Sequence, residues 1–175
     1  MRAMVLNEPG KLVATDAAVP VRKSHEAMIN VTHGGICGTD LKIYEGGIPT
    51  SYPLIMGHEM IGKVVEGSST DDVHEGSRVI VDPVLSCGKC FFCHSGLSNL
   101  CPDGTLLGRD QNGGFGEFVA APLTNIYPLP ESVSDREAPL IQVLTTCLHA
   151  HRRANIVAGE SGVCMGLGFR GLLHL

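Results

Sequence analysis

Short apolar segments, separated by glycine and proline, follow one another along most of this chain. The 175 residues include 22 glycines and 10 prolines, spread along the sequence. Many apolar positions are β-branched, which favours the pleated surface of a strand. The pattern therefore predicts a mainly β fold, a barrel or a sandwich, with strands at residues 2–6, 26–33, 61–66, 78–81 and 116–121.

The pattern changes after the segment Tyr-Pro-Leu-Pro at residues 127–130. Ser134 and Glu137 have the spacing of a capping box and predict a helix from residue 134 to about residue 153. We expect a domain junction within this stretch. Residues 1–150 would then form one domain and residues 151–175 would begin another.

Composition and charge narrow the class of protein. The chain is 43% hydrophobic, as expected for a globular protein, and no segment is long enough to span a membrane. The formal net charge of −5 gives no electrostatic footprint for nucleic acid. The N-terminus lacks a basic patch followed by an apolar signal core, so we expect a cytoplasmic protein with reduced thiols.

Four cysteines have the spacing of zinc ligands: Cys87, Cys90, Cys93 and Cys101. A closed four-thiolate shell leaves no position for water or substrate, so such a zinc is structural and orders the loop that carries it. The alternatives are disulfides, which fit poorly in a reducing compartment, or inert thiols. We predict one zinc that orders residues 87–101, and catalytic chemistry elsewhere.

A second group of candidate ligands precedes the cysteine lobe. It consists of Cys37 in Cys-Gly-Thr-Asp, and His58 in Gly-His-Glu. A thiolate and an imidazole from two loops would give zinc two ligands and leave positions for others, as a catalytic site requires. His58 and Glu59 do not form a metalloprotease motif, because the residue four positions after His58 is Gly62. Either segment alone is more often structural.

The order of these motifs closely resembles the catalytic domain of the zinc-dependent medium-chain alcohol and polyol dehydrogenases. Cys-Gly-Thr-Asp, Gly-His-Glu, the four-cysteine lobe and the Gly-Gly-Phe-Gly-Glu-Phe segment at 113–118 follow one another, so the resemblance covers essentially the whole chain. It implies a GroES-like barrel followed by a Rossmann domain, and oxidation of an alcohol or polyol with NAD(P). It also implies a homo-oligomer for a full-length parent.

The resemblance also implies roles for individual residues. Cys37 and His58 would bind the catalytic zinc, and the four lobe cysteines the structural zinc. Thr39 would take the proton from the substrate alcohol, since a hydroxyl can accept and donate. Lys42 stands where several relatives carry a relay histidine; it is either a final proton carrier or a solvated lysine. Asp40 and Glu59 would orient His58 and balance charge near the metal.

The chain departs from the family pattern at Gln142, where a cysteine or glutamate normally completes the catalytic zinc shell. A neutral carboxamide is a poor substitute, so we expect zinc to bind weakly or to be absent, with Glu59 or water completing the shell. Cys147 lies five residues further on and does not replace Gln142. His149 and His151 are two residues apart and cannot share a helix face.

The second departure is at the end of the sequence. Gly166, Gly168 and Gly171 match the G-x-G-x-x-G dinucleotide fingerprint after a short apolar run at 163–165. Only residues 172–175 follow Gly171, so we expect the helix, the second strand and the acidic residue that holds the ribose all to be missing. We therefore expect the first strand of a truncated Rossmann domain, in a fragment that is inactive by itself. A rival class is a non-enzymatic zinc-stabilised barrel that binds a partner; a zinc-free quinone reductase does not explain the cysteine lobe.

Overall fold

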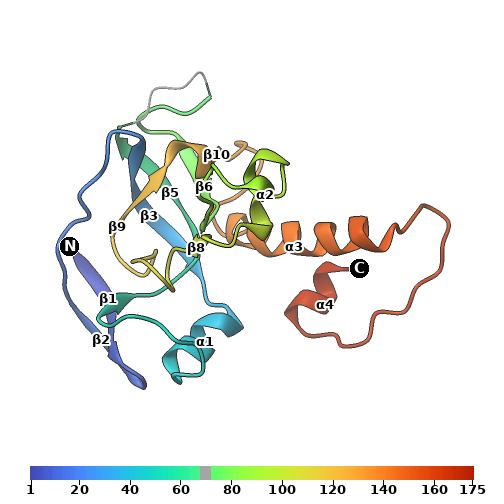
Figure 1. The fold of residues 1–175 in the computed structure, drawn as a ribbon, viewed down its shortest axis with the longest axis horizontal. Helices are drawn as coiled ribbons and strands as arrows, with labels where there is room; N and C mark the ends of the chain where they lie inside the picture. Colours follow the sequence, from blue (N-terminus) through green and yellow to red (C-terminus); the bar gives the residue numbers. More distant parts are fainter. Residues whose placement is uncertain (68–71) are drawn as a thin grey trace.

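The computed structural model describes residues 1–67 and 72–175 of the chain (Figure 1). Its elements are, in chain order, β1 (Arg2–Glu8), β2 (Lys11–Asp16), β3 (Glu26–Gly35), α1 (Gly38–Tyr44), β4 (Leu54–Ile55), β5 (Glu59–Glu66), β6 (Arg78–Val81), β7 (Val84–Leu85), α2 (Phe91–His94), the 3-10 turn η1 (Ser98–Leu100), β8 (Thr105–Leu106), β9 (Phe118–Pro122), the 3-10 turn η2 (Leu123–Asn125), β10 (Ile126–Pro128), α3 (Ala138–Ala154) and α4 (Phe169–Leu173).

The predicted mainly β fold is confirmed. The strands form a five-stranded sheet in the order β10-β6-β5-β3-β9, a three-stranded sheet β2-β1-β4, and the pair β7-β8. The larger sheet curls into a half-barrel beside the smaller one (Figure 1). Its core consists mainly of small and β-branched side chains, among them Ala27, Ile29, Val64, Val79 and Val119.

All five predicted strands are present, as β1, β3, β5, β6 and β9, with ends that differ by a few residues. The sequence pattern missed β2 because five of its six residues are exposed, so it has no alternation of apolar and polar positions. β2 is a strand because it pairs with β1, and its own sequence pattern does not indicate that pairing.

Helix α3 begins later than the capping box predicted. The amide of Glu137 donates to Ser134 Oγ at 3.3 Å, so the predicted pair does form. The residues between them make a turn, however, and the helix starts at Ala138 with Glu137 as its N-cap. The helix then runs without interruption to Ala154, so the predicted domain boundary at residue 150 falls inside it.

The last twenty residues leave the barrel and fold back on α3. The chain turns at Asn155, which has a left-handed backbone with φ 53°, and loops out before α4 packs against α3 (Figure 1). Residues 162–165, where the sequence predicted the first strand of a further domain, contain no strand. The paired strands within residues 1–67 and 72–175 are all antiparallel, so this part of the chain offers no parallel sheet for them to join. No helix in the two described ranges is long and apolar enough to cross a membrane.

Candidate metal centres

The four lobe cysteines lie together as a possible metal shell. Pairs of their sulfurs are 3.5 to 4.0 Å apart, and all four lie within 4.8 Å of one another. Sulfurs that bind one tetrahedral zinc at about 2.3 Å are about 3.8 Å apart. The donor set and its spacing therefore fit a structural zinc.

The thiols of this lobe influence one another's ionisation. The backbone amide of Lys89 lowers the pKa of Cys87 to about 7, with help from the Cys101 thiol. At Cys101 the backbone amide of Cys87 acts to lower the pKa, but desolvation and the thiols of Cys87 and Cys93 outweigh it and raise the pKa to about 11. Four thiols this close cannot all ionise unless a cation offsets their charge.

The second centre is assembled by the pairing of β3 with β5. Gly35, the last residue of β3, lies opposite Glu59, the first residue of β5. Cys37 follows Gly35 by two residues and His58 precedes Glu59, so this register brings the cysteine and the histidine together. Ligand atoms of Cys37, His58 and Glu59 lie within 4.8 Å of one another. The structure thus joins the two motifs, with Glu59 as a third possible ligand.

Close backbone packing holds the loop that carries His58. Gly57 has φ +91°, and a Cβ there would lie 2.3 Å from the ring of Phe115. The amides of Gly114 and Phe115 donate to the carbonyls of Gly57 and Met56 at 2.8 and 2.9 Å. The Gly-Gly-Phe segment predicted as part of the resemblance therefore supports the histidine loop through its backbone.

Asp40 is a buried partner of both ligands. Its Oδ2 accepts a hydrogen bond from the Cys37 amide at 2.8 Å, and its Oδ1 lies 3.3 Å from His58 Nδ1. Burial acts to lower the pKa of His58, but the adjacent carboxylate of Asp40, with a contribution from Cys37, outweighs it and raises the pKa to about 9. Asp40 therefore holds the imidazole by Nδ1 and leaves Nε2 for a metal.

The raised pKa of His58 has a consequence for the metal-free site. The ordinary pKa of histidine is about 6.5, so the stabilisation by Asp40 is fully present below that pH and is lost as the pH rises through about 9. We expect an NMR titration of His58, with zinc kept in the cysteine lobe alone, to show a midpoint near 9. Asp40→Asn should lower the midpoint, whereas a midpoint near 6.5 in the unsubstituted chain would contradict the assignment.

Thr39 and Lys42 lie on α1 with different surroundings. Burial acts to raise the pKa of Cys37, but the backbone and hydroxyl of Thr39 and the neighbouring His58 outweigh it and lower the pKa. Lys42 is exposed in the last turn of α1. Thr39 is thus beside the ligands, whereas Lys42 faces solvent.

Gln142 lies behind the histidine. It projects from α3, and its Nε2 donates to the carbonyl oxygen of His58 at 2.7 Å. The side chain therefore braces the backbone of the His58 loop. The family pattern predicted that Gln142 lies at this site, but it did not indicate this hydrogen bond.

The fingerprint glycines lie around α4, and Arg170 between them reaches the second centre. The expectation that no helix follows these glycines is wrong: Gly168 is the N-cap of the five-residue helix α4, which includes Gly171. A Cβ at Gly171 would lie 1.8 Å from the carbonyl oxygen of Gly166, so this turn requires glycine. Arg170 Nη2 donates to Cys37 Sγ at 3.9 Å. Arg170 was not among the residues predicted from the sequence, because only the glycines of the fingerprint were considered there.

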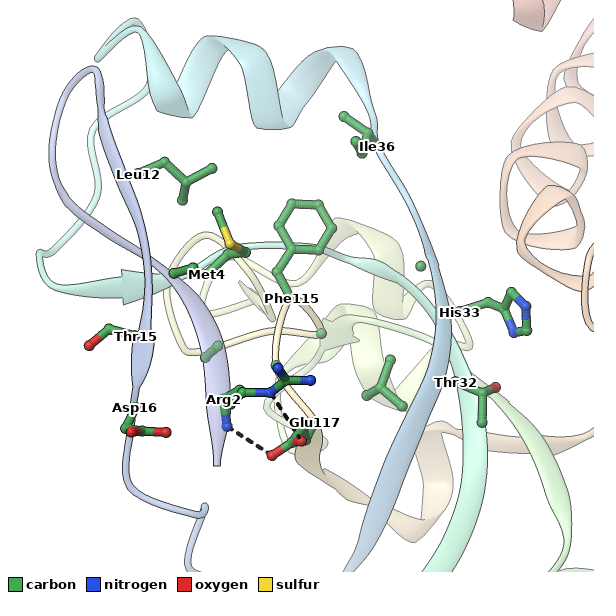
Figure 2. A pocket seen from close by; sticks show the side chains of 16 residues that line it. Arg2, Met4, Leu12, Thr15, Asp16, Thr32, His33, Ile36, Phe115 and Glu117 are labelled. Carbon is green, nitrogen blue, oxygen red and sulfur yellow. Dashed lines mark hydrogen bonds and ion pairs between the residues drawn. The ribbon is translucent and has the colours of Figure 1, made fainter.

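A cavity of about 870 Å³ lies beside the second centre, since Ile36, the residue before Cys37, is part of its lining. It opens between the β1–β2 hairpin and β3, with Phe115 at its back and Arg2 paired with Glu117 at its rim (Figure 2). None of the candidate ligands lines it. A smaller cavity of about 490 Å³ lies between β6, β10 and α3 and includes Gln142 in its wall. Cavity size therefore does not identify the chemical site here.

Comparison with known proteins gives consistent results. Residues 23–131 match the family model of the alcohol dehydrogenase GroES-like domain. L-galactonate-5-dehydrogenase of Escherichia coli K12 is 36% identical over 98% of this chain and 51% of its own length. Sorbitol dehydrogenase of Halalkalibacterium halodurans is 35% identical over 99% of this chain and 52% of its own.

A solved structure extends this similarity to the fold. The alcohol dehydrogenase rspB from E. coli CFT073, complexed with cofactor NADH, has a TM-score of 0.92 and 31% identity over 99% of this chain and 51% of its own. The chain thus spans about half the length of the relatives it matches. The motif order and the mainly β architecture agree with the match to residues 23–131. The chain therefore belongs to the alcohol dehydrogenase GroES-like domain family.

Proposed function

We propose that this chain supplies the catalytic domain of a zinc-dependent dehydrogenase that oxidises an alcohol or polyol with NAD(P). The observation that supports the proposal is the presence of two unlike clusters of candidate zinc ligands in one domain. One has four thiolates and no open position; the other has Cys37 and His58 with room for further ligands. The names of the relatives, which include sorbitol and L-galactonate dehydrogenases, support a hydroxyl-bearing substrate.

The residues of the second centre have complementary roles in this proposal. Zinc, when bound there, supplies Lewis-acid catalysis that makes an alcohol proton easier to lose while a hydride passes to NAD(P)⁺. Asp40 fixes the orientation of His58 through Nδ1. The hydroxyl of Thr39, close enough to Cys37 to lower its pKa, can accept the alcohol proton and pass it on. Lys42 would carry that proton only if the relay extends along α1; otherwise it is a solvated side chain.

Gly166, Gly168 and Gly171 form the proposed cofactor turn. The turn places Arg170 beside Cys37, so the dinucleotide segment and the second centre face each other. A complete dinucleotide site also needs a following strand and an acidic contact to the ribose. We therefore propose that these glycines bind NAD(P) only when the remainder of the nucleotide domain is present, as part of a homo-oligomer.

The proposal predicts that the 175-residue chain neither binds NAD(P) usefully nor turns over an alcohol by itself. Calorimetric titration of NAD⁺ and NADH into the chain should give no saturable binding tighter than about 1 mM. A panel of alcohols, polyols and sugar acids should yield no NAD(P)H above a no-protein control. The same panel, with a longer chain that carries a complete nucleotide domain, should yield NAD(P)H, and Thr39→Val should reduce the rate by about 10²-fold or more.

Two outcomes would contradict this proposal. Tight dinucleotide binding by the short chain would mean that it contains a cofactor site other than the fingerprint turn. A longer chain that holds two zinc ions but oxidises none of the substrates would favour the rival function, a zinc-stabilised binding module. Thr39→Ser, which keeps the hydroxyl, is the matched control for Thr39→Val.

A further inference from the structure

His151 and His174 meet where α4 folds back on α3. His151 Nε2 and His174 Nδ1 are 2.9 Å apart, although 23 residues separate them in the sequence. Their ring centroids are 4.9 Å apart and the ring planes are inclined by 38°, so the imidazoles meet edge to edge and do not stack. Both side chains are half-buried, which leaves one side of the pair open to water.

We propose that this pair is a third metal site, which binds one divalent nickel or copper ion through two imidazole nitrogens and water. Two nitrogens about 2.0–2.1 Å from a common metal are about 2.9 Å apart when they subtend 90° at it, which is the observed spacing, and about 3.3 Å apart at a tetrahedral zinc. The spacing therefore fits square-planar or octahedral nickel or copper, both of which take imidazole ligands, better than zinc. The site is separate from both centres described above and does not depend on the proposed dehydrogenase activity.

A metal bound to this histidine pair would link α4 to α3. One helical turn before His151, Cys147 Sγ lies 3.9 Å from the carbonyl oxygen of Arg170, which precedes His174 by four residues. The Cys147–Arg170 and His151–His174 contacts thus follow one another along the same α3–α4 interface. A metal at the histidines would fasten α4 to α3 and hold Arg170 near Cys37.

The alternative is a direct hydrogen bond from one neutral imidazole to the other, with no metal between them. In that bond one imidazole N–H would donate to the ring nitrogen of the other histidine, and no ion would be needed. Arg152 and Arg153 follow His151 and are exposed. Their positive charge weakens the attraction for a cation, so the test needs a probe metal with strong preference for imidazole.

The experiment is a calorimetric titration of Ni²⁺ into zinc-saturated protein, at a pH above the ordinary histidine pKa of about 6.5. We expect one saturable equivalent of Ni²⁺ in the unsubstituted chain. His151→Gln and His174→Gln should each weaken that binding by about tenfold or more. His149→Gln is the matched control, since His149 is exposed on another side of α3 and should leave the titration unchanged.

Hydrogen exchange provides a second measurement. Ni²⁺ should slow exchange of the α4 backbone amides in the unsubstituted chain and in His149→Gln, but not in the other two variants. Equal zinc content in all four proteins verifies that the barrel and cysteine lobe are folded. The proposal is wrong if all four proteins bind Ni²⁺ alike, if the unsubstituted chain binds none, or if binding leaves α4 exchange unchanged.

Discussion

Loss of zinc from the cysteine lobe is expected to disorder the segment between β7 and β8. The reason is that the lobe has no apolar core of its own: α2 and η1 contain no buried residue, and Phe91 is 75% exposed. Only the two-residue strands β7 and β8 close its base. Structural zinc contributes on the order of 10 kcal/mol in small zinc-binding peptides, far more than these contacts supply.

Cys93→Ser tests this expectation, because it removes one thiolate and leaves a weaker ligand. Metal analysis should find about one zinc fewer per chain, and the amides of residues 86–104 should exchange as rapidly as those of an unfolded segment. Cys164→Ser, at a half-buried cysteine outside the lobe, is the control and should change neither measurement. A freshly purified chain with no lobe zinc but a protected lobe would refute the assignment.

The sequence predicted those elements whose own residues have a clear pattern of apolar and polar positions. Strands with a run of consecutive buried residues, such as β3 and β6, were predicted from their own apolar residues. Helix α1 was missed because it has only seven residues, begins at Gly38 and buries just Asp40 and Ile43. Its N-cap is Cys37, which is not a usual capping residue. The helix is stabilised by the packing of Ile43 against Leu6, Leu54 and Met56, which are distant in sequence, so its helix propensity does not reveal it.

The candidate site residues also differ in whether local sequence could predict that they lie together. The four lobe cysteines lie within fifteen residues, so their spacing alone indicated a metal. Cys37 and His58 were joined only by resemblance, because their proximity depends on the β3–β5 register. The contacts of Arg170 with Cys37 and of His174 with His151 depend on the path of the last twenty residues, for which the sequence contains no pairing signal.

Gln142→Glu is expected to raise zinc occupancy at the Cys37–His58 centre. In the unsubstituted chain the Gln142 amide donates to the carbonyl of His58, and a carboxylate cannot make that bond. The substituted side chain is therefore repelled from the carbonyl oxygen and becomes available as an anionic zinc ligand. We expect an increase of about tenfold or more in zinc affinity, the range found for groups that support metal ligands.

The measurement is competition for zinc against a chelator, with the lobe zinc counted separately. Gln142→Leu is the matched control: it also removes the bond to His58, at a cost of about 1 kcal/mol in folding stability, but adds no ligand. Glu59→Gln should lower the affinity of the unsubstituted centre if Glu59 completes it now. If the unsubstituted chain already holds a second, chelator-resistant zinc, or if leucine raises occupancy as much as glutamate does, then residue 142 is not the position of the missing ligand, and the anion that completes this centre is to be sought at Glu59.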